Sequence, residues 1–202
     1  MLISIHPDNP QPRQLSMVKD CLENGGIIAY PTDTIYGLGC DIFHPEAIEK
    51  ICAIKKVAPE KAQLSFICAD LSNLSNYAKS IDNSLYRIMK KLLPGPYTFI
   101  LPASKEVPKI LQNKKKTIGL RIPDNKIALG IIETLGHPIL SASFPGEQVE
   151  DYTDPELIQE HWGHLVDMVI DGGIGGMIPS TVIDCTSEEL SVIRQGAGVW
   201  EY

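Results

Sequence analysis

The chain has 202 residues, of which 44% are hydrophobic and 21% charged, and its formal net charge at pH 7 is −7. A chain of this length buries enough surface to fold without disulfides or metals, so a small stapled scaffold is excluded. No apolar run approaches the roughly 18 residues of a membrane-spanning helix, and the N-terminal residues lack the pattern of a secretory signal. Five widely spaced cysteines without a CxxC pair predict reduced, mostly buried thiols. We therefore expect a cytoplasmic protein that makes no membrane contact.

The charge is distributed unevenly along the chain. Residues 141–202 contain 12 acidic side chains and one basic side chain, Arg194, whereas the first 140 residues contain 17 basic and 13 acidic ones. The densest basic stretch spans residues 105–126 and can attract phosphates, although we expect Lys114, Lys115 and Lys116 to form a solvated loop. A protein whose main role is to grip long nucleic acid is usually basic overall, which this chain is not.

Short apolar, β-branched runs bounded by Gly, Pro and Ser predict nine strands. In chain order these are residues 2–5, 27–30, 64–68, 97–101, 117–122, 139–142, 166–170, 181–185 and 191–194. Amphipathic patterns predict five helices, at residues 12–23, 45–55, 82–93, 127–135 and 155–162. Because a helix does not separate every pair of strands, we predict an α/β fold with a twisted, mixed β-sheet, packed helices and a single domain over residues 1–202.

The common catalytic signatures are absent from the sequence. It contains no GxxxxGK[ST] phosphate loop, no GxGxxG, no GxSxG nucleophile elbow and no HExxH. His161 and His164 share one face of a predicted helix, but the sequence offers no further ligands nearby, so we interpret them as a surface pair. We therefore predict no metal site and no covalent nucleophile.

Polar groups instead interrupt otherwise apolar strands at a few points. Thr32, Asp33 and Thr34 follow the strand that ends near residue 30, and Ser141 and Ser143 lie on the same side of another strand. Arg121 is embedded in an apolar strand, where it needs an anionic partner, either a protein carboxylate or a ligand. Ser180 follows a glycine-rich segment and opens a strand. Hydroxyls, backbone amides and separated cations at strand ends suit a small-anion or nucleotide site.

Six motifs in this order carry a resemblance to a known family. They are YPTDTIYGLG, PGPYTFIL, IGLRIP, LSAS, PSTVID and RQG, which lie between residues 30 and 196. The resemblance that they carry covers residues 25–196. The series resembles the YrdC-like family, the threonylcarbamoyl-AMP synthases of tRNA modification, and in particular its YciO-like branch.

The resemblance implies a fold, a reaction and partners. The fold is YrdC-like, with a concave, positively charged face that holds the active site. The reaction, a nucleotidyl transfer, joins L-threonine, bicarbonate and ATP into threonylcarbamoyl-AMP and releases pyrophosphate, with Mg²⁺ accompanying ATP. A downstream tRNA-modification complex then transfers the threonylcarbamoyl group to adenosine 37 of tRNA. This chemistry needs positioning and charge neutralisation rather than an enzyme nucleophile.

The resemblance also assigns roles to individual residues. Threonine would contact Thr32, Thr34, Arg121 and Ser180, with Tyr36 in the same segment as the two threonines. ATP would contact Lys55, Lys61, Ser141, Ser143 and Arg194.

Three positions depart from the family pattern. Val57 replaces the arginine of the KxR motif, and Ser143 replaces the asparagine of SxN. Cys68 or its neighbour stands where the family has a histidine. A lost cation at a phosphate costs about 1.5–3 kcal/mol, and Lys56 can replace it only in part because it lacks the planar fork.

These departures leave two alternatives to a synthase. One is an RNA- or nucleotide-binding paralogue with weak or no synthase activity, and the other is a protein-interaction subunit. The low aromatic content of 6% argues against extensive base stacking on RNA.

Overall fold

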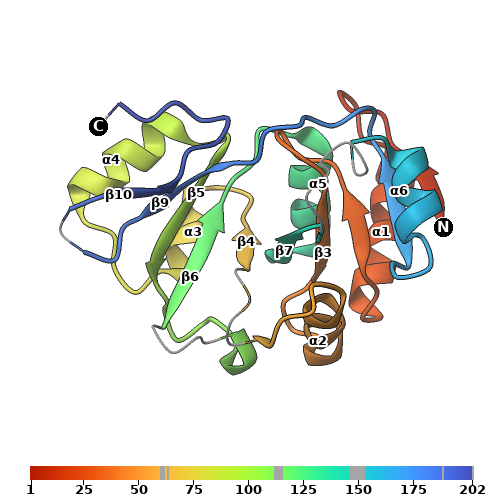
Figure 1. Ribbon diagram of the computed structural model, residues 1–202, viewed down its shortest axis with the longest axis horizontal. Coiled ribbons are helices and arrows are strands. Elements are labelled where there is room, and N and C mark those ends of the chain that lie inside the picture. Colours follow the sequence, from red (N-terminus) through yellow and green to blue (C-terminus); the bar gives the residue numbers. More distant parts are fainter. Residues whose placement is uncertain (60–61, 63, 112–115, 146–152, 188, 202) are drawn as a thin grey trace.

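Figure 1 shows the computed structural model of the chain, in which one long sheet runs across the molecule and helices pack against it. The structure describes residues 1–59, 62, 64–111, 116–145, 153–187 and 189–201. The predictions made for Lys61, Lys114 and Lys115 lie outside these residues. In the described part of the chain, no helix is both long enough and apolar enough to cross a bilayer.

Ten strands form one mixed sheet in the order β1-β8-β2-β3-β7-β4-β6-β5-β9-β10. The pairs β1–β8, β2–β8, β4–β6 and β5–β9 are parallel and the others are antiparallel. The strands are β1 (Leu2–Ser4), β2 (Ile28–Tyr30), β3 (Gly37–Asp41), β4 (Ser65–Ile67), β5 (Tyr97–Pro102), β6 (Thr117–Arg121), β7 (Ile139–Ser143), β8 (Met168–Asp171), β9 (Thr181–Asp184) and β10 (Ser191–Arg194). The predicted α/β fold with a mixed sheet is confirmed, and each predicted strand is present within two residues of its expected ends.

Strand β3 is absent from the sequence prediction, because Gly37 and Gly39 indicate a turn there. All five residues of β3 are buried, and the strand pairs with β2 on one side and β7 on the other. A Cβ atom at Gly39 would lie 3.0 Å from Cε1 of Tyr30, and one at Gly37 would lie 3.4 Å from the same atom. The two glycines therefore leave space for the Tyr30 ring to lie across β3.

Six α-helices are present among the described residues. They are α1 (Pro12–Glu23), α2 (Pro45–Ile54), α3 (Leu71–Tyr77), α4 (Asn83–Leu92), α5 (Lys126–Leu135) and α6 (Pro155–Trp162). Helix α3 was not expected, because its sequence LSNLSNY is short and has little apolar periodicity. Asp70 caps its N-terminus, because the Asp70 side chain accepts a hydrogen bond from the backbone N–H of Asn73 at 2.7 Å.

The two faces of the sheet are covered to different extents. One face packs against α2, α3, α4 and α6 in the larger hydrophobic cluster, which also contains the buried thiols of Cys40, Cys52, Cys68 and Cys185. On the other face, α1 and α5 pack against β2, β8 and neighbouring strands. In the described structure, this second face carries no helix over β5, β6, β9 and β10. All five cysteines are free and four are buried, as predicted.

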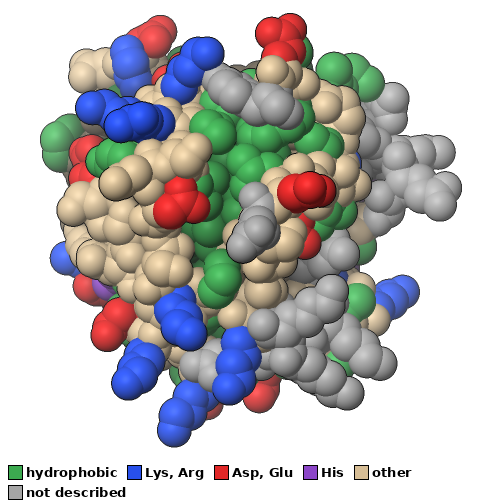
Figure 2. Space-filling view, turned by 90° about the vertical axis from the view of Figure 1, so that its left-hand side faces the viewer, with side chains coloured by type: hydrophobic (Ala, Val, Ile, Leu, Met, Phe, Trp, Pro, Cys, Tyr) green, Lys and Arg blue, Asp and Glu red, His purple; other side chains and the backbone are tan. Residues whose placement is uncertain are grey.

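Strands β1 and β10 form the two edges of the sheet. Figure 2 looks onto the β10 end, where hydrophobic side chains gather at the centre of the view. Exposed apolar residues in this part of the chain include Val192, Ile193 and Val199. The β9–β10 register shifts between Val192 and Arg194, and such a bulge disrupts the ladder that another strand would need for pairing.

Candidate functional site

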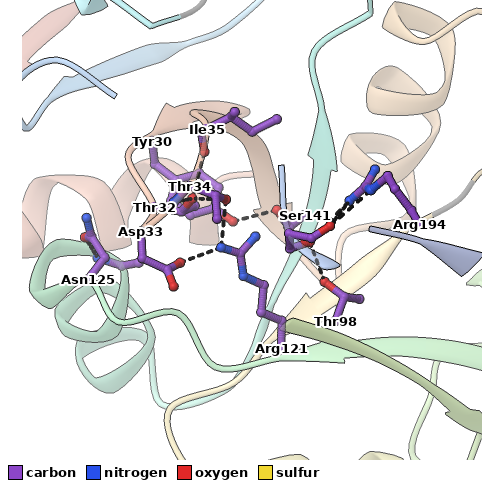
Figure 3. Close-up of polar contacts among 12 residues, drawn as sticks. Tyr30, Thr32, Asp33, Thr34, Ile35, Thr98, Arg121, Asn125, Ser141 and Arg194 are labelled. Carbon is purple, nitrogen blue, oxygen red and sulfur yellow. Dashed lines mark hydrogen bonds and ion pairs between the residues drawn. The ribbon is translucent and has the colours of Figure 1, made fainter. Parts of the chain in front are cut away.

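Small and polar side chains occupy the part of the second face that has no helix. The register places Gly119 and Ser141 on either side of Ser65, so these three positions share one face of the sheet. Arg121 and Ser143 each lie two residues further along and point to the same face. We call this surface, together with the adjoining turn and loop residues, the polar face. It consists of Thr32, Asp33, Thr34, Ser65, Thr98, Gly119, Arg121, Ser141, Ser143, Ser180 and Arg194. Figure 3 shows part of it, with Thr32, Asp33, Thr34, Thr98, Arg121, Ser141 and Arg194 labelled.

The turn after β2 meets Arg121 at the end of β6. Nη2 of Arg121 forms an ion pair with Oδ1 of Asp33 and donates a hydrogen bond to Oγ1 of Thr34 at 2.8 Å. The hydroxyl of Thr32 lies 3.1 Å from that of Thr34 and donates to the carbonyl of Ile35 at 2.7 Å. The sequence left open whether Arg121 has a protein or a ligand partner, and the structure provides a protein carboxylate.

Ser141 is joined to the same turn through Tyr30, the last residue of β2. The Tyr30 hydroxyl donates to Oγ of Ser141 at 2.6 Å, and both residues are buried. Burial raises the pKa of Tyr30 to about 12, so this hydroxyl remains protonated at neutral pH. Ser141 is therefore held within the polar face by a neutral hydrogen bond.

Ser180 and Arg194 lie together at the other end of the polar face. Nε and Nη2 of Arg194 donate to the carbonyl oxygen of Ser180 at 3.0 and 2.8 Å, while Oγ of Ser180 lies 2.9 Å from Oγ1 of Thr98. Burial and the nearby positive charge of Arg121 both lower the pKa of Arg194. The two guanidinium groups therefore lie close enough to repel each other.

Lys55, the residue after α2, reaches the polar face through Ser143. Its Nζ donates to the backbone carbonyl of Ser143 at 2.7 Å and to its hydroxyl at 3.2 Å. Burial lowers the pKa of Lys55. The amine is thus partly desolvated, a state in which its attraction for an anion is stronger than in open water.

The residues that follow Lys55 complete the end of α2. Lys56 has a φ of 53°, and the N–H of Val57 donates to the carbonyl of Cys52 at 3.0 Å, which is the hydrogen bond of a Schellman motif. Val57 is 37% exposed. The position that carries arginine in the KxR motif is therefore accessible here but has no cation.

The structure brings together all the predicted site residues that it describes. Thr32, Thr34, Arg121, Ser141, Ser143, Ser180, Arg194 and Lys55 belong to the polar face or contact it, whereas Lys61 lies outside the described residues. Cys68 differs, because its side chain is buried in the cluster on the opposite face. Tyr36 also packs there, and its hydroxyl donates to the carbonyl of Gly173 at 2.7 Å.

Sequence reasoning did not assign four residues of this region. They are Tyr30, Asp33, Ser65 and Thr98. The position of Asp33 between two threonines at the end of a strand could have indicated that it belongs to the site. Ser65 and Thr98 carried no local signal, because only the pairing of β4, β5 and β6 brings them to the polar face.

The described residues include no group of three or more His, Cys, Asp or Glu side chains that could hold a metal ion. His161 and His164 are both exposed. The charged groups of the polar face and its border are mainly cationic, namely Arg121, Arg194 and Lys55. These side chains suit anionic oxygens of a ligand rather than a metal cation.

Comparisons with known proteins support the family that the motifs predict. The Sua5/YciO/YrdC family model, described as telomere recombination, matches residues 20–196. The YciO protein of Escherichia coli is 46% identical over 96% of this chain and 94% of its own length, and its crystal structure superposes with a TM-score of 0.91 over 98% and 97%. A threonylcarbamoyl-AMP synthase of Vibrio vulnificus is 30% identical over 90% of this chain and 98% of its own length. The structure of P. abyssi Sua5 complexed with L-threonine matches with a TM-score of 0.86 and 27% identity, over 97% of this chain and 57% of the longer Sua5 chain.

The chain therefore belongs to the Sua5/YciO/YrdC family. Within the family it is more similar to YciO than to the protein named as a synthase, as the sequence motifs predicted.

Proposed function

We propose that the chain binds L-threonine and ATP side by side on the polar face and forms threonylcarbamoyl-AMP and pyrophosphate, with bicarbonate as the third substrate. In this scheme Thr32, Thr34, Arg121 and Ser180 bind threonine, and Lys55, Ser141, Ser143 and Arg194 bind ATP. The product would pass to a downstream tRNA-modification complex.

The observation that carries the proposal is the meeting of residues from six separate segments on one surface. Thr34 contacts Arg121, Lys55 contacts Ser143, and Ser180 contacts Arg194. Such a surface, with three cations and several hydroxyls, suits a ligand pair that carries one carboxylate and a triphosphate. Relatives that carry the synthase name and the Sua5 structure with L-threonine give further support.

The chemistry requires no nucleophile from the chain. The threonine amine forms an N–C bond with the carbon of bicarbonate as water leaves, and a carbamate oxygen then displaces pyrophosphate from the α-phosphorus of ATP. Lys55 and Arg194 would stabilise negative charge on the phosphates, and the hydroxyls would orient the two reactants. Mg²⁺ would arrive with ATP and be bound mainly by phosphate oxygens and water.

A nucleotide-binding paralogue with little turnover is the second candidate. The observation that favours it is Val57, an exposed position without the cation of the KxR motif. In that case ATP would bind, but pyrophosphate release would not depend on threonine.

Pyrophosphate release distinguishes the two candidates. The purified protein is incubated with ATP, Mg²⁺ and bicarbonate, with and without L-threonine, and pyrophosphate and the adenylate product are followed. A synthase gives threonine-dependent release that falls when Arg194 is replaced by Ala. The matched control is Arg87→Ala, which removes an exposed cation from α4 on the opposite side of the sheet and should leave the rate unchanged. Release that does not depend on threonine would reject the synthase function.

A further inference from the structure

Asp33 and Arg121 form a buried pair that leaves polar atoms unused. Each side chain is only 9% exposed, and the two meet through Oδ1 of Asp33 and Nη2 of Arg121. Oδ2 of Asp33 and Nε of Arg121 are also buried, and neither has a hydrogen-bond partner among the described residues. Unpartnered buried polar atoms are rare in folded proteins, and in a binding site they indicate atoms that a ligand satisfies.

The two unpartnered atoms have opposite requirements. Oδ2 of an ionised carboxylate only accepts hydrogen bonds, and Nε of a guanidinium only donates them. An isolated phosphate or carboxylate would satisfy Nε but would be repelled by Oδ2. An α-amino acid carries an ammonium group and a carboxylate on a single carbon atom, so it presents both complementary groups close together.

We propose that Asp33 receives the amino group of the amino-acid substrate, while Arg121 binds its carboxylate. Asp33 is then a positioning and specificity residue that selects ligands with a free amino group and orients that group. Thr34, the residue after Asp33, helps to hold the turn against Arg121. Its hydroxyl accepts a hydrogen bond from Arg121, and its backbone carbonyl accepts one from the N–H of Gly176 at 2.7 Å. This inference rests on the proposed function and adds to it the group that recognises the amine.

Two analogues of threonine separate the contributions of its charged groups. 3-Hydroxybutyrate lacks the amino group, and 1-aminopropan-2-ol lacks the carboxylate. The unmodified protein should bind L-threonine about 10- to 100-fold more tightly than either analogue, the range expected for one charge-assisted hydrogen bond. Binding is measured by calorimetry or by NMR titration.

The Asp33→Asn variant should change only one of these two preferences. It should bind L-threonine and 3-hydroxybutyrate within about threefold of each other, because the group that senses the amine is gone. Its preference for L-threonine over 1-aminopropan-2-ol should persist, because Arg121 remains. A variant that only loosened the fold would weaken all three ligands alike and leave the ratios unchanged. Asp124→Asn, which neutralises an exposed carboxylate three residues after Arg121, is the matched control and should keep both preferences.

The outcomes separate this inference from the proposed function. Equal binding of L-threonine and 3-hydroxybutyrate by the unmodified protein would overturn the role of Asp33, and this test holds even if the variant does not fold. Full retention of the amine preference in Asp33→Asn would overturn it as well. Both results leave threonine binding in place, whereas no binding of L-threonine to the unmodified protein would reject the proposed function itself.

Discussion

At the scale of single residues, Arg121 depends on its neighbours within the chain. A guanidinium group with 9% of its side chain exposed has lost most of its hydration, and the negative charge of Asp33 offsets that loss. Asp33 therefore has a structural role as well as the proposed binding role, because its charge stabilises the buried Arg121 in β6.

We predict that Arg121→Ala lowers the free energy of unfolding by about 3–5 kcal/mol, because it leaves the Asp33 carboxylate buried without a compensating charge. Asp33→Ala should cost a similar amount. The double variant should lose clearly less than the sum of the two single losses, because no charge is left uncompensated. Urea unfolding measures all three, and additive losses would show that the two side chains are not coupled.

Val57 is the position at which the proposed synthase activity can be tested by adding a cation. Val57→Arg places a cation beside Lys55 at a position that is 37% exposed, so the substitution should not disturb the fold. We expect threonine-dependent pyrophosphate release to rise about tenfold or more, which corresponds to one new charge-assisted hydrogen bond. Val57→Gln supplies a long polar side chain without charge and is the control. No gain in the arginine variant would mean that another cation, such as Lys56, already serves the phosphates.

At the scale of elements, the end of α2 carries a measurable strain. Lys56 occupies the left-handed region with a φ of 53°, where a residue with a Cβ costs about 1–2 kcal/mol and glycine costs little. We predict that Lys56→Gly raises the free energy of unfolding by about 1 kcal/mol, whereas Lys56→Ala, which keeps the Cβ, gives no gain. Chemical denaturation checks both variants. A loss of stability in Lys56→Gly would contradict the Schellman geometry.

The elements also show what a sequence pattern can and cannot predict. Of the nine strands that the sequence predicts, seven contain buried residues in the structure, and burial on one or both faces explains their apolar runs. The other two, β1 and β10, form the edges of the sheet and contain no buried residue. Strand β3 could not be predicted in this way, because two of its residues are glycines. These glycines leave space for the ring of Tyr30, which lies on another strand. Asp33 could be noted from its position in the turn, but its pairing with Arg121 depends on contact between β2 and β6 regions that are 88 residues apart.

In the candidate site, too, some residues could be predicted from the local sequence and others could not. Arg121 stood out because a charged side chain in an apolar strand needs a partner, and Ser141 and Ser143 followed from the two-residue period of a strand. Ser65 and Thr98 could not be found in this way, because a serine or threonine in a strand is compatible with many environments. The roles of all these residues in binding remain predictions.

At the scale of the whole molecule, burial favours the protonated form of several tyrosine hydroxyls and cysteine thiols. Burial raises the pKa of Tyr30 and Tyr36 to about 12 from 10, and that of Cys185 to about 12 from 9. These groups ionise at lower pH in the unfolded chain than in the folded one. Their contribution to stability is therefore complete below pH 9 and is lost as the pH rises toward 12.

We predict that the free energy of unfolding decreases steadily between pH 9 and pH 11. Lys55 opposes this trend, because burial lowers its pKa, but one lysine is outweighed by several acids. Tyr36→Phe removes one titrating group, so its stability should fall less steeply with pH than that of the unmodified protein. Denaturant unfolding at a series of pH values tests this, and a flat profile over the range would contradict the burial of these hydroxyls and thiols.

The central claim is that one surface of the sheet binds an amino acid and a nucleotide together. Two-dimensional ¹H–¹⁵N NMR of the 22.2 kDa chain, titrated with L-threonine and then with a non-hydrolysable ATP analogue, tests this claim directly. We predict that L-threonine shifts the backbone signals of residues 32–34, 119–121 and 180, and that the nucleotide then shifts those of residues 55, 141–143 and 194. Shifts confined to α3 and α4, which pack on the opposite face of the sheet, or no shifts with either ligand, would contradict the account.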